Sequence, residues 1–216
     1  YYTLESAHVM ESLKTELHCH NIFSNGHVGT LEPIHDCNVT IPKQLEQAYL
    51  AGLDVLFVTN HNTIDGYRQI LEYKKNHQKF DALNVYPAEE VTTDNESHVL
   101  VYGIDHSIKS GLSLHEVLDE AKKQNAVITA HHPFSLLVAL REDCFYCDLF
   151  EAFNSSKVDV YSNLRAKKFA KEKSLHVVAG SDSHVQSTIG RSTNLIYSEN
   201  KLDSIIAAMK QHKIII

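Results

Sequence analysis

The chain has 216 residues, of which 27 are acidic and 20 are basic, so its formal charge at neutral pH is −7. This length favours one domain, and a 43% share of apolar residues is enough for a packed core. The negative charge argues against general binding to duplex nucleic acid, which needs a basic surface. No apolar run approaches the roughly 20 residues of a membrane helix, and no charged and apolar leader opens the sequence, so we expect a cytoplasmic protein without membrane contact.

Short β-branched runs, typical of strands, recur along the whole chain. The first strand candidate ends at residues 17–20, and further strands are predicted at residues 53–60, 83–91, 97–104, 126–132, 148–154, 175–181 and 193–197. A polar turn at residues 94–96 joins two of them. Helical patterns fall between many of these runs, which predicts βα units and a largely parallel sheet. About seven strands in one domain of this size favour a closed barrel, with a doubly wound sheet as the alternative.

Three helices carry recognisable sequence signals. Pro42 occupies a first-turn position, and Gly52 follows the end of the same helix. Ser113 and Glu116 form a capping box in front of an apolar stripe that continues to residue 121. Residues 202–209 repeat the same apolar spacing near the C-terminus. These signals predict helices on the outside of the sheet.

Cysteine and histidine usage restricts the chemistry. Four cysteines are too few for a disulfide scaffold in a chain of this length, so we interpret the thiols as reduced. Cys144 and Cys147 form one Cys-x-x-Cys pair, for which a redox or zinc role stays an alternative. The 15 histidines are unusual, because their full protonation would change the charge to about +8. We therefore expect an acid-sensitive protein.

Residues of the types that can bind metals follow or begin several of the predicted strands. They are His18, His20, His61, Glu89, Glu90, His98, His131, His132, Asp182 and His184. Residues two apart on a strand point to the same face, so His18 and His20 can chelate one ion. Since the C-terminal ends of parallel strands open onto one face of a barrel, these side chains should converge there. Such a gathering of buried imidazoles and carboxylates requires cations, and the pattern predicts a multinuclear metal site.

The motifs also resemble those of a known family. Leu17-His18-Cys19-His20, Asn60-His61-Asn62, the Glu90 strand, His132-Pro133-Phe134 and Gly180-Ser181-Asp182-Ser183-His184 are similar, in this order, to the successive motifs of the PHP (polymerase and histidinol phosphatase) family. The resemblance covers residues 14–197, nearly the whole chain. It implies a single domain over residues 1–216 with a distorted (β/α)7 TIM-like barrel. It also implies two or three divalent metal ions, such as Zn, Mn or Fe, at the C-terminal face.

The resemblance assigns ligands to each ion. His18, His20, Glu90 and Asp182 would hold the first ion, and Glu90 would bridge to a second ion held also by His98 and His132. A third ion would use His61, His184 and a residue from the loop after His20, which is Asn25 by spacing, with His27 as the alternative. The choices of Glu90 over Glu89 and of His132 over His131 follow from the family pattern.

The activity implied is that of a metal-dependent phosphoric ester hydrolase. It would cleave a phosphomonoester or a nucleotide phosphate ester through a metal-bound hydroxide, with a small phosphorylated molecule or nucleotide as its partner. The predicted catalytic residues are His184, which would orient a substrate oxygen, together with Asp182 and His61, while Arg191 and Arg141 would bind the phosphate. The alternatives are a histidinol-phosphate phosphatase, a metal-binding PHP module without catalysis, and a hydrolase of C–N bonds.

Overall fold

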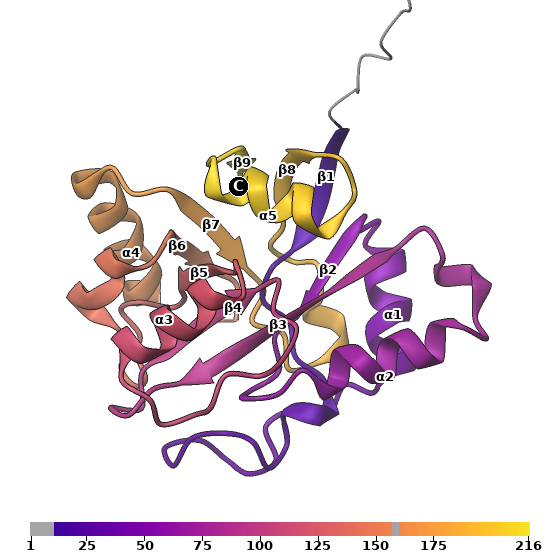
Figure 1. Cartoon of the computed structure of the whole chain (residues 1–216), viewed down its shortest axis with the longest axis horizontal. Helices are drawn as coiled ribbons and strands as arrows, with labels where there is room; N and C mark the ends of the chain where they lie inside the picture. The colour runs from indigo at the N-terminus through magenta and orange to yellow at the C-terminus, as the bar shows by residue number, and fades with distance from the viewer. Residues whose placement is uncertain (1–10, 157–159) are drawn as a thin grey trace, which may run out of the picture.

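A mixed β-sheet forms the centre of the molecule in the computed structural model, which describes residues 11–156 and 160–216 (Figure 1). Its strands are β1 (Glu11–Glu16), β2 (Val55–Val58), β3 (Asn84–Thr92), β4 (His98–Tyr102), β5 (Val127–Ala130), β6 (Leu149–Asn154), β7 (Val177–Gly180), β8 (Asn194–Ser198) and β9 (Ile214–Ile215). The order across the sheet is β7-β6-β5-β4-β3-β2-β1-β8-β9. Every strand predicted from the sequence is present, and β9 is additional.

Helices surround this sheet, with α1 and α2 beside β2 and β3, and α3 and α4 beside β5 and β6 (Figure 1). The α-helices are α1 (Ile41–Leu50), α2 (Asp65–Lys74), α3 (Leu114–Lys123), α4 (Val160–Lys173) and α5 (Leu202–Lys210). The 3₁₀ helices are η1 (Ile22–Ser24), η2 (Gln78–Phe80), η3 (Arg141–Tyr146) and η4 (Gln186–Thr188). The Ser113–Glu116 capping box is confirmed at the start of α3. Neither α2 nor α4 is among the helices predicted by residue range, and α4 lacks a clear apolar stripe.

The sheet curves into a nearly closed barrel, as the sequence predicted. Beyond the ends of β1 and β7 the chain pairs in parallel, because the Asp182 amide donates to the His18 carbonyl at 2.8 Å and the His20 amide donates to the Ser183 carbonyl at 3.0 Å. The Asn194 side chain spans the seam further down: Ala179 N donates to its Oδ1 at 2.9 Å, and its Nδ2 donates to the Ala179 carbonyl at 2.8 Å. These contacts bring the motifs at the two ends of the barrel sequence together.

The sheet is less parallel than the sequence suggested. β4 is antiparallel to both β3 and β5, and β8 is antiparallel to β1. The reason for the first reversal is the short polar turn between β3 and β4, where Thr93 N donates to the Ser97 carbonyl at 2.8 Å. A connection of a few residues can only join antiparallel neighbours. His98 therefore begins its strand but still lies at the same end of the barrel as Glu90.

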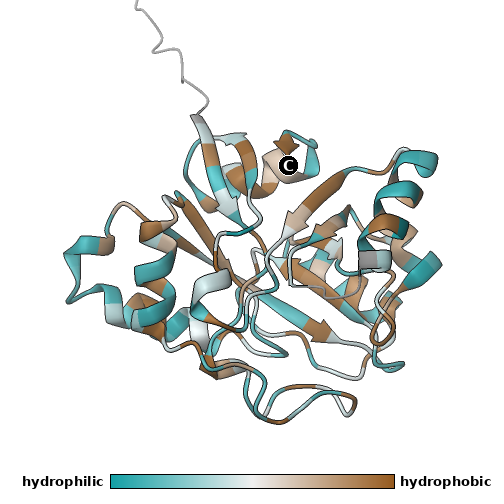
Figure 2. Cartoon of the chain, turned by 180° about the vertical axis from the view of Figure 1, so that it is seen from behind, coloured by the Kyte–Doolittle hydropathy of each residue, from teal (hydrophilic) through white to brown (hydrophobic). Residues whose placement is uncertain are grey.

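The interior of the barrel is filled with apolar side chains, and Figure 2 shows the hydrophobic colour concentrated on the strands. Phe57, Tyr102 and Val178 belong to the inner cluster, against which Ile205 and Met209 of α5 also pack. The Tyr102 hydroxyl donates to the Leu17 carbonyl at 3.0 Å, so this buried polar group is satisfied. In the part of the chain that is described, no helix is long and apolar enough to cross a membrane. The single domain over residues 1–216 stays a prediction, since residues 1–10 and 157–159 lie outside the described ranges.

Candidate metal centre

Side chains from six strands meet at one end of the barrel. His18 and His20 follow β1, His61 follows β2, Glu90 lies near the end of β3, His98 begins β4, His131 and His132 follow β5, and Asp182 and His184 follow β7. All of them except His184 are buried. The predicted convergence is therefore present in the structure.

Four groups of possible ligand atoms, each spanning no more than 4.8 Å, lie in this region of the described chain. They are His18 with His20 and Glu90; Glu90 with His98, His131 and His132; His20 with Asp36, His61 and His184; and Glu32 with His61 and His98. Because these groups share Glu90, His20, His61 and His98, they form one continuous cluster.

Glu90 is the central carboxylate of this cluster. Its Oε1 lies 2.6 Å from His98 Nδ1 and 2.7 Å from His131 Nε2, and its Oε2 lies 3.2 Å from His18 Nε2 and 3.1 Å from His20 Nε2. Burial alone would raise the pKa of the Glu90 carboxyl group, but the surrounding imidazoles outweigh burial and hold it well below its usual value. Glu90 is therefore an ionised carboxylate with imidazoles on both of its oxygens.

Several buried ligand atoms make no hydrogen bond with the described part of the chain. They are His20 Nε2, both ring nitrogens of His61, His98 Nε2 and Asp36 Oδ2. His20 Nε2 lies 3.1 Å from Glu90 and Asp36 Oδ2 lies 2.9 Å from His184 Nε2, yet neither pair has hydrogen-bond alignment. Buried polar atoms nearly always have partners, so atoms that face one another without bonding fit a site for cations. The imidazole and carboxylate set suits Zn²⁺, Mn²⁺ or Fe²⁺.

A second layer of polar groups orients these ligands. His18 Nδ1 lies 2.9 Å from Glu151 Oε1, and this carboxylate also accepts the His132 amide at 2.8 Å. Since a carboxylate accepts, we assign the proton to His18 Nδ1, which leaves Nε2 free to face the cluster. Asn154 Nδ2 donates to both Glu151 and Asp182, at 3.0 and 3.1 Å. Any side chain at Gly180 would clash with Glu151 and His18, so the close packing here requires glycine.

Two carboxylates of the cluster were missed by the sequence analysis. Glu32 and Asp36 lie on the loop after β1, and Asp36 Oδ2 lies 3.4 Å from His61 Nε2. Asn25, predicted as the loop ligand, binds the backbone of this loop in the structure: its Oδ1 accepts the Asp36 and Cys37 amides at 2.8 and 2.9 Å, and its Nδ2 donates to the Cys37 carbonyl at 2.9 Å. Asn25 therefore holds the loop that presents Asp36. The sequence did contain a signal for these two ligands, because two acidic residues follow the His-x-His motif within one loop.

The remaining alternatives are decided by contacts. Glu89 lies outside the cluster, since its carboxylate accepts the Ile108 amide, and burial raises its pKa to about 7. His131 and His132 both belong to the cluster, so choosing one of them was too narrow. His27 is exposed and lies outside the four groups.

Neither predicted arginine reaches the cluster. The pocket above it has a volume of about 240 Å³ and is lined by Glu32, Asp36, His61, Glu90, His132, Val138, Asp182 and His184. Arg141 lines a separate pocket with Arg165, and Arg191 is exposed outside both pockets. The loop after His132 directs Arg141 away from the metal pocket. Val138 lines the metal pocket, whereas the residues that follow Val138 line the separate pocket that contains Arg141.

Within residues 11–156 and 160–216, the Cys-x-x-Cys pair has no further metal ligands beside it. Cys144 is buried and Cys147 is half-buried, and both thiols are free. Burial raises the pKa of each thiol, which disfavours the reactive thiolate. Neither cysteine is part of a metal-binding group in the described residues. We therefore interpret the pair as part of the packing between η3 and the sheet.

The fold and this cluster define a class: barrel proteins that gather buried histidines and carboxylates for divalent metals at one rim. Residues 160–214 match a family model described as PHP-associated. The uncharacterized protein MJ1587 of Methanocaldococcus jannaschii is 31% identical over 166 residues, which cover 74% of this chain and 93% of that protein. The chain belongs to the PHP family.

Solved structures share the fold. Endonuclease Q from Pyrococcus furiosus, a lesion-specific endonuclease, superposes with a TM-score of 0.68 at 18% identity, over 93% of this chain and 56% of that chain. A proposed metal-dependent phosphoesterase from Bifidobacterium adolescentis superposes with a TM-score of 0.58 at 16% identity, over 80% of this chain and 88% of that chain. At these identities the likeness concerns the barrel.

Proposed function

We propose that this chain hydrolyses phosphate esters at a centre of two or three divalent metal ions. The observation that carries the proposal is Glu90, whose two oxygens face two different groups of imidazoles at the base of an open pocket. A carboxylate in this position suits neighbouring ions on either side of it. The likeness to a proposed phosphoesterase of the same fold supports the same reaction class.

The ions would activate water near neutral pH and take up negative charge from the phosphate. His18, His20, Glu90 and Asp182 would hold one ion. Glu90, His98 and the His131–His132 pair would hold another, and His61, His184 and Asp36 would hold a third. Asp36 replaces Asn25 in this set, which gives the third ion a charged ligand.

His184 differs from the other imidazoles of the cluster. Its side chain is 29% exposed, whereas those of His20 and His61 are 0% and 2% exposed. Asp36 and Asp182 fix the ring from both sides, with His184 Nδ1 3.0 Å from the Asp182 carbonyl. His184 therefore lies where an incoming substrate would first meet the cluster, and we assign the orientation of a phosphate oxygen to His184 together with the third ion that it would hold. Asp182 and His61 serve the reaction by holding the ions.

The pocket dimensions restrict the substrate. A volume of about 240 Å³ accommodates a phosphoryl group and a small part of its ester, so the rest of the substrate would lie outside. A small phosphorylated metabolite or a nucleotide fits this geometry. The arginines predicted for phosphate binding do not line the pocket, so the ions and His184 would carry most of the recognition of the phosphate.

The test combines metal analysis with phosphate release. Protein loaded with Mn²⁺ is expected to contain two or three ions per chain and to release phosphate from p-nitrophenyl phosphate, a nucleoside monophosphate or histidinol phosphate. The Asp182→Asn variant is expected to lose this activity, while Asp65→Asn on the surface of α2 is expected to retain it. If no substrate is hydrolysed with Mn²⁺, Zn²⁺ or Fe²⁺, the proposed activity is wrong, and the alternative of a metal-binding module without catalysis is favoured.

A further inference from the structure

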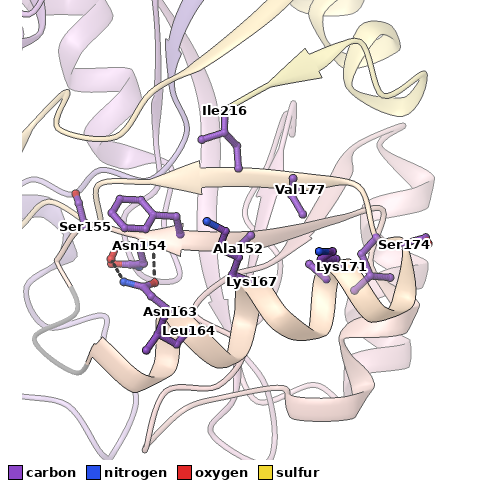
Figure 3. Close-up of a pocket in the computed structure, with 13 residues that line it drawn as sticks. Ala152, Asn154, Ser155, Asn163, Leu164, Lys167, Lys171, Ser174, Val177 and Ile216 are labelled. Atoms are coloured by element: carbon purple, nitrogen blue, oxygen red, sulfur yellow. Dashed lines mark hydrogen bonds between the residues drawn. The ribbon is translucent and has the colours of Figure 1, made fainter.

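An apolar groove lies on the outside of the barrel, between α4 and strands β6 and β7 (Figure 3). Its volume is about 1030 Å³, which is at the upper end for sites that bind drug-sized molecules. Ala152, Leu164, Val177 and Ile216 line it, and the side chains of Leu164 and Ile216 are more than half exposed. An open hollow with exposed apolar walls is a feature of binding sites.

Strand β6 is shaped to widen this groove. Successive residues of a strand normally point to opposite faces, yet Ala152 and Phe153 both line the groove. The pairing of β6 with β7 shifts register between Glu151 and Phe153, which turns an additional residue toward the same side. Glu151, just before the shift, points inward to His18. The residue before the register shift therefore contributes to the metal centre, and the residues after it form the groove.

Two lysines provide the positive charge of the groove. Lys167 and Lys171 are one helical turn apart on α4, and Figure 3 shows both side chains directed from the helix toward the strands. Neither has an acidic partner within 4 Å in the described chain, whereas Lys168 on the same helix lies 3.8 Å from Glu172. The groove therefore has two ammonium groups that are available to an anion.

Other polar groups at the inner end of the groove are already paired. Asn154 N donates to Asn163 Oδ1 at 2.9 Å, and Asn163 Nδ2 donates back to the Asn154 carbonyl at 2.8 Å, as the dashed lines in Figure 3 show. A ligand would consequently meet apolar walls and two lysines. This combination selects a molecule with an apolar body and one anionic end.

We propose that this groove binds a single-chain anionic amphiphile, with its hydrocarbon chain on Ala152, Leu164 and Val177 and its carboxylate or phosphate on Lys167 and Lys171. The head group needs only negative charge, so a fatty acid and an alkyl phosphate share the required chemistry. The site is separate from the metal centre and does not depend on the reaction proposed for it.

A single tryptophan can report binding at the groove itself, because the chain contains none. In the Leu164→Trp protein, laurate or dodecyl phosphate below the micelle concentration is expected to shift tryptophan emission to shorter wavelength with saturation at one ligand per chain. Dodecanol is expected to bind at least tenfold more weakly, and acetate not at all. Equal binding of dodecanol, or no shift with either anion, would overturn the proposal.

Charge variants test the lysines in the same protein. Lys167→Ala with Lys171→Ala is expected to weaken laurate binding at least tenfold, and the corresponding pair of Arg variants is expected to restore it. Lys168→Ala is the matched control on the same helix and should change binding less than twofold. The proposal fails if the double Ala variant, with its melting temperature unchanged, binds laurate like the parent. It also fails if an acidic amphipathic peptide saturates the reporter and laurate does not.

Discussion

The metal pocket and the α4 groove lie on opposite sides of β6 and differ in nearly every physical respect. The pocket has a volume of about 240 Å³ and is lined mostly by carboxylates and imidazoles, while the groove has about 1030 Å³ and apolar walls. Glu151 binds His18 of the metal cluster and Ala152 lines the groove, so one strand contributes to both regions. The comparison shows that a large apolar hollow is suited to binding a ligand. A catalytic site instead needs a cavity in which ionisable side chains lie close together, even if that cavity is smaller.

The largest effect is expected from a ligand of the metal pocket. His20→Ala should reduce phosphate release by about 10³-fold or more, or about 4 kcal/mol of transition-state stabilisation, because His20 belongs to two of the ligand groups. His27→Ala is the matched control, since His27 is an exposed histidine of the following loop. Steady-state rates with saturating Mn²⁺ measure both, and a fully active His20→Ala protein would remove the ligand assignment.

Metal removal should lower the stability of the protein through the metal pocket and independently of the α4 groove. Chelation is expected to lower the free energy of unfolding by about 4 kcal/mol relative to protein with metal at about 1,000 times its Kd, because the ions bind the folded chain alone. The double variant of Lys167 and Lys171 should show the same loss. Urea unfolding with EDTA and with Mn²⁺ measures this difference, and equal curves would contradict a buried metal centre.

The pH dependence of the free energy of unfolding tests whether Glu89 is a protonated carboxyl group outside the metal cluster. The pKa of its buried carboxyl group is about 7 in the fold against 4.5 for the ordinary group, so the folded chain keeps a proton that the unfolded chain releases. Stability contributed in this way is lost as pH rises from about 4.5 to about 7, by about 3 kcal/mol.

The Glu89→Gln variant should lack this loss. In metal-free protein it should match the parent at pH 4.5 and exceed it in free energy of unfolding at pH 8. Urea unfolding at the two pH values measures the difference. A constant difference between the two proteins at both pH values would show that Glu89 is ionised in the fold.

Asn25 tests how far the metal pocket depends on its loop. Asn25→Ala releases the Asp36 and Cys37 amides, and loss of such an outer partner typically costs roughly 10–100-fold in metal affinity or activity. Excess Mn²⁺ should restore much of the rate. Asn38→Ala on the same loop is the control, and equal rates for both variants would show that Asp36 needs no such support.

The smallest effect is expected from the groove. Replacing Lys167 and Lys171 with alanine should change phosphate release by less than about twofold, since both lysines lie outside the 240 Å³ pocket. The same assay as for His20→Ala measures it. A large loss of activity would show that the two regions form one substrate site.

Most of the barrel was predictable because its strands are short apolar runs with histidines at their ends. His18 and His20 could be placed on one face from strand geometry alone, and the family pattern favoured Glu90, which lies in the ligand groups, over Glu89. The reversal of β4 was implied by the turn at residues 94–96, but it was given less weight than the overall alternation of strands and helices.

What could not be predicted depends on loops. Asp36 enters the cluster from a loop whose backbone Asn25 binds, and the direction of Arg141 depends on a loop whose course has no sequence period. Spacing from His20 led to Asn25, a residue of the right polarity with a different role. The sequence also could not show which residues of β6 point inward and which point outward. A register shift between Glu151 and Phe153 interrupts the regular alternation from which these directions are predicted.

Asn194 has a consequence for how this barrel exchanges protons with solvent. At the seam with β7 its side chain occupies both the acceptor and the donor positions opposite Ala179 that a neighbouring backbone would otherwise provide. The Ala179 amide is therefore protected by one rotatable side chain, while the amides inside the paired strands are protected by whole ladders. Because Asn194 and Ala179 are both fully buried, deuterium uptake at Ala179 reports the opening of this seam.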